Sequence, residues 1–214
     1  MLKIDTHAHY LPRDWPDLAA KYGDIRFPVI HHGDDGRSRN YKDGKFFREI
    51  WPKTWDPKIR IDEFAEFGVQ VQVLSTVPVM FSYWAKPQHA HDLHQALNDH
   101  MAEAVRDFPR HYAGIGTVPL QSPRLAIQEL ERCIDQLGLQ GVQIGSHIND
   151  WNLDAAELFD FFQAASELGA AILVHPWDMM GSESMPKYWL PWLVGMPAEQ
   201  SRAACSLVFG GVLE

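Results

Sequence analysis

Short apolar runs rich in valine and isoleucine alternate along the chain with segments whose apolar residues recur at helical spacing. The apolar runs have the length of β-strands and cover residues 2–10, 69–77, 112–118, 141–146 and 170–175. The helical pattern covers residues 93–108, 123–138 and 153–169, and Gly138 is placed to end the second helix. Strands that alternate with helices of this length predict parallel strands joined by right-handed crossovers. The pattern therefore predicts an α/β fold, either doubly wound or closed into a (β/α)8 barrel.

Residues 11–60 break this alternation. They are rich in proline, glycine, tryptophan and charge, and the pair Asp43 and Gly44 predicts a β-hairpin between polar and aromatic stretches. We expect this segment to be a small lid inserted after the first strand. Near the other end, four prolines and three tryptophans in residues 176–197 predict a long loop whose first half is not helical. We treat residues 1–214 as one α/β domain that contains the lid.

Composition narrows the class of protein. The 214 residues are 46% hydrophobic and 22% charged, which is typical of a globular protein. A net charge of -9, with 19 basic residues among 28 acidic ones, argues against a protein that binds the nucleic-acid backbone. Neither a disulfide framework, a targeting peptide nor an apolar run of about 20 residues is present. We expect a cytoplasmic protein with no nucleic acid and no membrane as partner.

Two histidines lie at the end of the first predicted strand. His7 and His9 are two positions apart, so in a regular strand both side chains project from one face, about 6.6 Å apart. This spacing alone is weak evidence for a metal, because two hydrogen-bonded polar residues at a strand end have the same pattern. Asp5 shares their parity and is expected one layer deeper on the same face, where a carboxylate could orient the site.

A third histidine strengthens the metal interpretation. His175 ends the last apolar run and is followed by Pro176. In a parallel barrel the carboxyl ends of all strands reach the same face, so His7, His9 and His175 would converge there. Three imidazoles leave one position open for water, which is the arrangement of a catalytic zinc ion.

The other histidines are not assigned to the metal. His89, His91 and His94 lie beside the apolar stripe of a predicted helix, and we expect them on its solvated face. The remaining ones have no partner at ligand spacing or lie in the lid: His31, His32, His100, His111 and His147.

Several longer stretches carry a family resemblance. They are IDTHAHYLPRDWPDL, KDGKFFRE, LSTVPVMFSYWAKP, GVQIGSHIND, VHPWDMM and KYWLPWLVGMPAE, and together they span nearly the whole chain. The chain resembles the amidohydrolase superfamily, and in particular its metal-dependent decarboxylases. The resemblance implies a (β/α)8 TIM barrel, of which this chain would supply about the first five strand-helix units, and one zinc ion per subunit.

The resemblance also implies roles for individual residues. His7, His9 and His175 match the zinc ligands, and Arg48 and Lys42 of the lid match residues that hold a substrate carboxylate. Two further matches are pocket-wall residues: Met179 and Trp189. The implied reaction is the non-oxidative decarboxylation of a small dicarboxylate by a homodimer.

Two residues of the family pattern have no match in this chain. The resemblance places a general-base histidine and an aspartate zinc ligand on later strands, beyond Glu214. From this we expect a polypeptide of residues 1–214 alone to be inactive and poorly stable.

The sequence leaves two alternatives to a decarboxylase. A metal-dependent hydrolase, such as a lactonase or an amidase, shares the HxH pair and the barrel. Binuclear hydrolases commonly use a lysine on the fourth strand, whereas GVQIGSHIND has none, so the mononuclear decarboxylase is favoured. The other alternative is a fragment without catalytic function.

Overall fold

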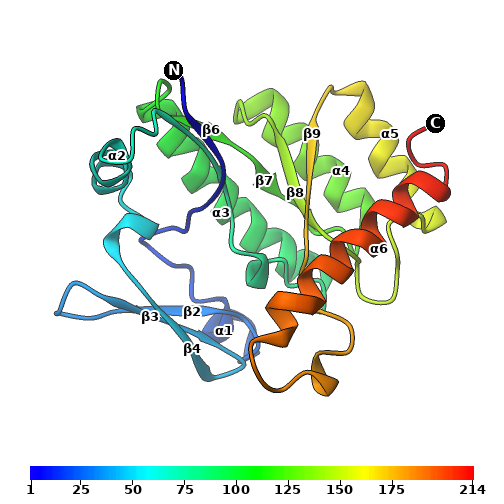
Figure 1. The fold of residues 1–214 in the computed structure, drawn as a ribbon, viewed down its shortest axis with the longest axis horizontal. Helices are drawn as coiled ribbons and strands as arrows, with labels where there is room; N and C mark the ends of the chain where they lie inside the picture. Colours follow the sequence, from blue (N-terminus) through cyan, green and yellow to red (C-terminus); the bar gives the residue numbers. More distant parts are fainter.

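A computed structural model describes residues 1–214 and shows parallel strands covered by helices (Figure 1). Two parallel three-stranded sheets have the orders β1-β5-β6 and β7-β8-β9. Their strands are β1 (Ile4–His9), β5 (Val71–Ser75), β6 (Tyr112–Gly114), β7 (Gly116–Thr117), β8 (Gly141–Gly145) and β9 (Ala171–His175). Only Ile115 separates β6 from β7, and its N–H donates to the carbonyl of Leu74 at 2.8 Å. The strands thus follow one another in space in the order of the chain.

The main helices follow the strands along the chain. They are α2 (Pro57–Ala65), α3 (Pro87–Asp107), α4 (Pro123–Glu131), α5 (Phe159–Glu167) and α6 (Met196–Phe209), with a short α1 at Leu18–Tyr22. Single π-helical turns at Arg132–Gln136 and Pro191–Gly195 adjoin α4 and α6, and 3-10 turns lie at Pro52–Thr54, Pro78–Met80, Ala156–Leu158 and Ser182–Ser184. None of these helices combines the length and apolar character needed to cross a bilayer.

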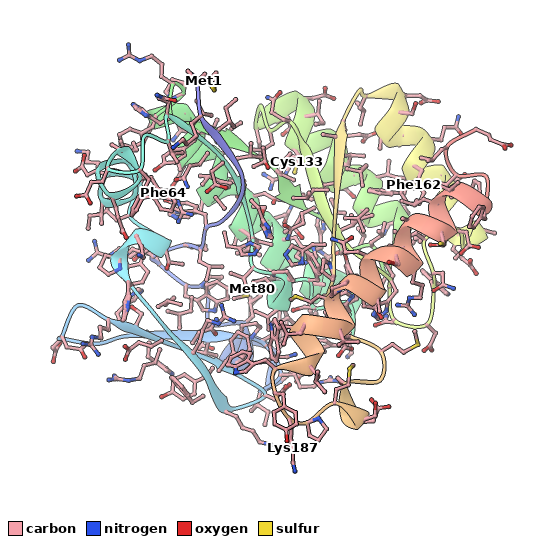
Figure 2. All side chains as sticks on the ribbon, in the orientation of Figure 1. Met1, Phe64, Met80, Cys133, Phe162 and Lys187 are labelled. Carbon is pink, nitrogen blue, oxygen red and sulfur yellow. The ribbon has the colours of Figure 1, made fainter.

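Two hydrophobic clusters hold these layers together. The larger one joins the strands to α3, α4 and α5 and includes Leu74, Ile144 and Phe161, all fully buried. The smaller one lies beneath the segment that follows β1 and includes Phe27 and Met80. Figure 2 labels one side chain of each cluster, Cys133 in the larger and Met80 in the smaller.

The five predicted strands are all present, and the bounds of three elements differ from the prediction. Residues 112–118 form two short strands, α3 begins six residues before the predicted position 93, and the helix predicted from 153 begins as a 3-10 turn at Ala156. Helix α2 was not predicted, because its first residues lie in the irregular segment 11–60. Gly138 has the predicted left-handed conformation after α4, with φ of 68°.

The segment after β1 forms a small antiparallel sheet. Its strands are β2 (Val29–His32), β3 (Ser38–Lys42) and β4 (Lys45–Ile50), in the order β2-β3-β4. The predicted hairpin is confirmed: Asp43 and Gly44 have φ of 54° and 68°, as a two-residue turn with left-handed positions requires. Strand β2 was not predicted. This sheet carries Lys42 and Arg48 on its adjacent strands.

Strand β1 contains a β-bulge that changes the direction of its side chains. The bulge lies between Asp5, which pairs with Gln72, and Ala8, which pairs with Leu74, so two residues of β1 oppose one residue of β5. Paired residues share a face, and Ala8 and Leu74 belong to the core beneath the helices. Asp5 therefore faces the helices and His9 faces the opposite side. The expectation that Asp5 shares a face with His9 is wrong, because one extra residue reverses the alternation.

The expectation of a solvated face for the α3 histidines is also wrong for two of them. His91 and His94 are only 3% and 0% exposed. The buried face of α3 is wider than its apolar stripe, and both histidines lie on it together with Leu97 and Met101. The Nε2 of His94 hydrogen-bonds the carbonyl of Phe81 at 3.0 Å, and the Nε2 of His91 meets a carboxylate oxygen of α4 at 3.1 Å. They are structural core histidines.

The burial of His94 predicts a pH-dependent stability. Desolvation by burial lowers the pKa of His94 from 6.5 to about 4. The unfolded chain therefore binds a proton that the folded chain does not, so stability falls as the pH falls from about 6.5 toward 4. Between pH 7 and pH 5, this residue should reduce the free energy of unfolding by about 2 kcal/mol.

Urea unfolding at the two pH values tests this, with His94→Gln as the comparison because its amide can still donate to the carbonyl of Phe81. The variant should lose about 2 kcal/mol less than the wild type over this range. Equal losses in both proteins would show that His94 does not contribute to the pH dependence.

Candidate metal centre and cavity

Three histidines from distant parts of the chain lie together. The ligand nitrogens of His7, His9 and His175 all lie within 4.8 Å of one another. The Nε2 atoms of His7 and His175 are 3.1 Å apart, although β1 and β9 are the outermost strands of the set. The strands must therefore curve, so that the carboxyl ends of the two outer strands approach each other.

The donor atoms of the cluster fit a divalent metal ion. Two nitrogens bound at about 2.0–2.1 Å to a tetrahedral ion lie about 3.4 Å apart, which is close to the 3.1 Å between His7 and His175. The Nδ1 of His175 hydrogen-bonds the carbonyl of Pro176 at 2.7 Å, which makes Nδ1 the donor and leaves the lone pair of Nε2 for a metal. The Nδ1 of His9 is buried without a partner.

Burial favours the neutral, metal-binding form of two of these imidazoles, His9 and His175. Burial, together with the neighbouring His175 and His7, lowers the pKa of His9 to about 4. Burial also lowers the pKa of His175. Metal binding needs the neutral imidazole, so His9 and His175 can accept an ion near neutral pH without first losing protons.

The cluster lines a cavity of about 690 Å³. Lys42, Arg48 and Met179, which the resemblance assigns to the substrate pocket, line the same cavity. Neither Lys42 nor Arg48 makes a salt bridge, whereas Arg39 of the same small sheet lies 3.8 Å from Asp35 on the surface. Two cations without a counterion beside three metal-binding side chains indicate an anionic ligand.

The rest of the lining is largely aromatic and apolar. It includes Phe47, Val77, Val79, Trp177, Trp192 and Met196. Such walls bury the flat faces of a conjugated ligand, while the few polar groups set its orientation. A cavity of this size accommodates a small organic acid.

The structure does not bring Trp189 into the cavity lining. Trp189 is 71% exposed and has a left-handed backbone with φ of 57°. It packs edge-on against Trp192, with ring centroids 5.0 Å apart, and Trp192 is the one that lines the cavity. The tryptophans of this segment are close in sequence, so only the course of the backbone decides which one faces the ligand.

Trp177 is a wall residue that the sequence analysis missed, although it follows the ligand His175 by two positions. Its Nε1 donates to the carbonyl of His147 at 2.9 Å, and its ring packs edge-on against buried Tyr83. A Cβ atom at Gly145 would lie 2.6 Å from the Trp177 ring, so only glycine leaves room there. The signal in the sequence that could have identified Trp177 is its position two residues after His175, which ends a strand.

One buried carboxylate holds the wall segments together. Glu199 of α6 is 2% exposed and accepts hydrogen bonds from Ser146 Oγ at 2.9 Å and from the Met180 N–H at 3.1 Å. Arg202, one turn later, donates to it at 2.6 Å. These contacts join the segments that follow β8 and β9 to the helix that forms the far side of the cavity.

Comparison with known proteins identifies the family. Residues 4–214 match the amidohydrolase family. The chain belongs to this family. The amidohydrolase is 53% identical, over 213 residues, to 2-amino-3-carboxymuconate-6-semialdehyde decarboxylase of Dictyostelium discoideum. A protein of the same name from Caenorhabditis elegans is 34% identical over 261 residues. These relatives confirm the predicted resemblance to decarboxylases.

The matches cover this amidohydrolase fully and the relatives in part. They include 100% and 99% of the chain, but 59% and 65% of the two relatives, so the chain spans about three fifths of their length. A crystal structure of a dihydroxybenzoic acid decarboxylase from Polaromonas, with bound manganese and the inhibitor 2-nitroresorcinol, superposes with a TM-score of 0.73. It shares 22% identity and covers 99% of this chain and 61% of its own, which establishes the common amidohydrolase-type α/β fold.

Proposed function

We propose that this protein is a metal-dependent carboxy-lyase that converts 2-amino-3-carboxymuconate 6-semialdehyde to 2-aminomuconate 6-semialdehyde. The observation that carries the proposal is the cavity in which three convergent histidines lie beside the unpaired cations Lys42 and Arg48. The relative that is 53% identical bears the name of this activity, which supports the choice of substrate. The reaction releases carbon dioxide and needs no oxidant.

The two cations would hold the substrate by its carboxylates. Arg48 offers a planar pair of donors that suits a carboxylate, and Lys42 offers a point charge on the neighbouring strand. Phe47 and Trp177 would cover the flat conjugated chain and keep water from it. The substrate would then lie with its polar ends toward the cations and toward the histidine cluster.

We propose zinc, one ion per chain, held by His7, His9 and His175. When bound, such an ion supplies a Lewis acid and lowers the pKa of a water molecule. The manganese in the Polaromonas protein makes manganese the second metal to test. The second nitrogen of His175, held by the carbonyl of Pro176, would keep the ring oriented toward the ion.

The proposed function also includes the barrel, the lid and the oligomeric state. The parallel strands would form part of a (β/α)8 barrel, and residues 11–60 would act as a lid, since Lys42, Phe47 and Arg48 of this segment line the cavity. We further propose a cytoplasmic homodimer. Size measurement of the complete protein by light scattering tests the dimer.

Spectroscopic assay of the complete protein tests the reaction. The absorbance of the conjugated semialdehyde should fall in the presence of zinc-loaded protein, with one equivalent of carbon dioxide released per substrate consumed. Loss of absorbance without carbon dioxide, or hydrolysis of lactones and amides instead, would assign the protein to the hydrolases of the same superfamily.

The wall network around Glu199 gives a further prediction. In Glu199→Gln one oxygen becomes an amide that cannot accept from Arg202, so the wall segments should loosen and KM should rise by about 10-fold, corresponding to about 1.4 kcal/mol. Glu129→Gln is the matched control, because Glu129 is equally buried and pairs with Arg132 at the same spacing, away from the cavity.

Steady-state kinetics and thermal unfolding of both variants separate a role of Glu199 in the cavity wall from a role in stability alone. Both should melt at lower temperature, but only Glu199→Gln should change KM. An equal change of KM in both, or in neither, would show that Glu199 serves stability alone.

A further inference from the structure

The β-bulge of β1 determines which side chains reach the metal centre. In a regular strand residues 5, 7 and 9 share one face. The bulge instead places Asp5 on the face of the helices and His9 on the face of the cavity. Without the extra residue, either Asp5 would enter the cavity or His9 would turn toward the helices. The metal site therefore depends on the persistence of the bulge.

The side chain of Asp5 closes this bulge. Its Oδ1 accepts the backbone N–H of His7 at 3.1 Å. A bulge leaves backbone groups without their regular ladder partners, and an unpaired N–H costs free energy unless another group accepts it. The Oδ2 of Asp5 accepts Nε2 of Gln72 at 3.0 Å, so both carboxylate oxygens are used.

A buried arginine sets the orientation of Gln72. The Nε of Arg60 donates to the amide oxygen of Gln72 at 2.9 Å, and its Nη1 donates to the carbonyl of Lys53 at 2.7 Å. Arg60 is 6% exposed, Gln72 is 3% exposed, and Arg60 has no carboxylate within salt-bridge distance. Because Arg60 only donates, Gln72 must turn its oxygen to Arg60 and its NH₂ group to Asp5.

We propose that Asp5, Gln72 and Arg60 are positioning residues that maintain the bulge and thereby present His7 and His9 to the metal ion. The inference rests on the metal site of the proposed function and does not depend on the identity of the substrate. The chain of contacts reaches from helix α2 to the ligand strand, although none of the three side chains lines the cavity. Its loss should weaken metal binding by about 10- to 100-fold, the usual effect of residues that orient metal ligands.

Metal affinity of the complete protein, measured by competition with a chelator of known zinc affinity, tests the inference. Asp5→Asn alone sets two amide NH₂ groups against each other, and Gln72→Glu alone sets two carboxylates against each other. Each single variant should bind zinc about 10- to 100-fold more weakly. Together the two substitutions restore the pattern, because the new amide donates to the new carboxylate, which also accepts from Arg60. The double variant should return to within about threefold of the wild type.

Thermal unfolding and Glu129→Gln provide the controls. Glu129 belongs to a buried network between α3 and α4, so its variant should lose stability and keep its zinc affinity. Single variants with wild-type affinity, or a double variant that regains stability without regaining affinity, would overturn the inference. A wild-type protein that binds zinc through the histidines but releases no carbon dioxide would remove the proposed reaction and leave this inference standing.

Discussion

Replacing His175 with alanine should abolish both metal retention and decarboxylation. His175 supplies one of only three nitrogens in the cluster, and its Nε2 lies 3.1 Å from that of His7. Loss of a residue that only orients a metal ligand lowers metal affinity by about 10- to 100-fold. Loss of a ligand itself should therefore lower zinc affinity by more than about 100-fold. Zinc content after dialysis, measured by elemental analysis, and the rate of carbon dioxide release check the two effects.

His31→Ala is the control for this substitution. His31 is exposed on β2 and lies outside the cavity lining, so its variant should keep zinc and activity. Because removal of His175 deletes a buried ring, thermal unfolding must accompany the measurement. A folded His175→Ala protein that retains one equivalent of zinc would contradict the assignment of this ligand.

Arg48→Ala should weaken substrate binding far more than it changes stability. Arg48 is exposed, lines the cavity and makes no salt bridge, so its removal leaves the fold without an unpaired buried group. Against a bound carboxylate, its loss should cost roughly 2 to 5 kcal/mol, a rise in KM of about 30-fold or more. Steady-state kinetics give KM, and urea unfolding gives the stability.

The matched control is Arg39→Ala on the same small sheet. Arg39 faces Asp35 on the surface and does not line the cavity, so its variant should have wild-type kinetics. If both arginine variants raise KM equally, general electrostatic attraction explains the effect, and the assignment of Arg48 to the carboxylate is wrong.

The predictable parts of this structure are those that depend on local sequence. The strands follow from apolar runs, and the hairpin follows from the Asp43 and Gly44 pair, because a two-residue turn needs left-handed positions that these residues adopt readily. His9 and His175 end their strands, and the parallel arrangement alone suffices to bring strand ends to one side.

The features that were not predicted depend on contacts between distant residues. The bulge of β1 arises from its register against β5 and from the hydrogen bond between Asp5 and His7, neither of which has a pattern in the sequence. Whether Trp189 or Trp192 faces the cavity depends on the course of an irregular loop. The burial of His94 follows from a buried face of α3 that is wider than its apolar stripe, because it also includes His91, His94 and Asn98.

Titration of the metal-free protein with zinc tests the central claim most directly. Carbon dioxide release from 2-amino-3-carboxymuconate 6-semialdehyde should be absent without metal, should rise in proportion to added zinc, and should level off at one equivalent per chain, as the single cluster of His7, His9 and His175 requires. Full activity in the metal-free protein, or a plateau at two equivalents, would contradict a mononuclear metal-dependent decarboxylase.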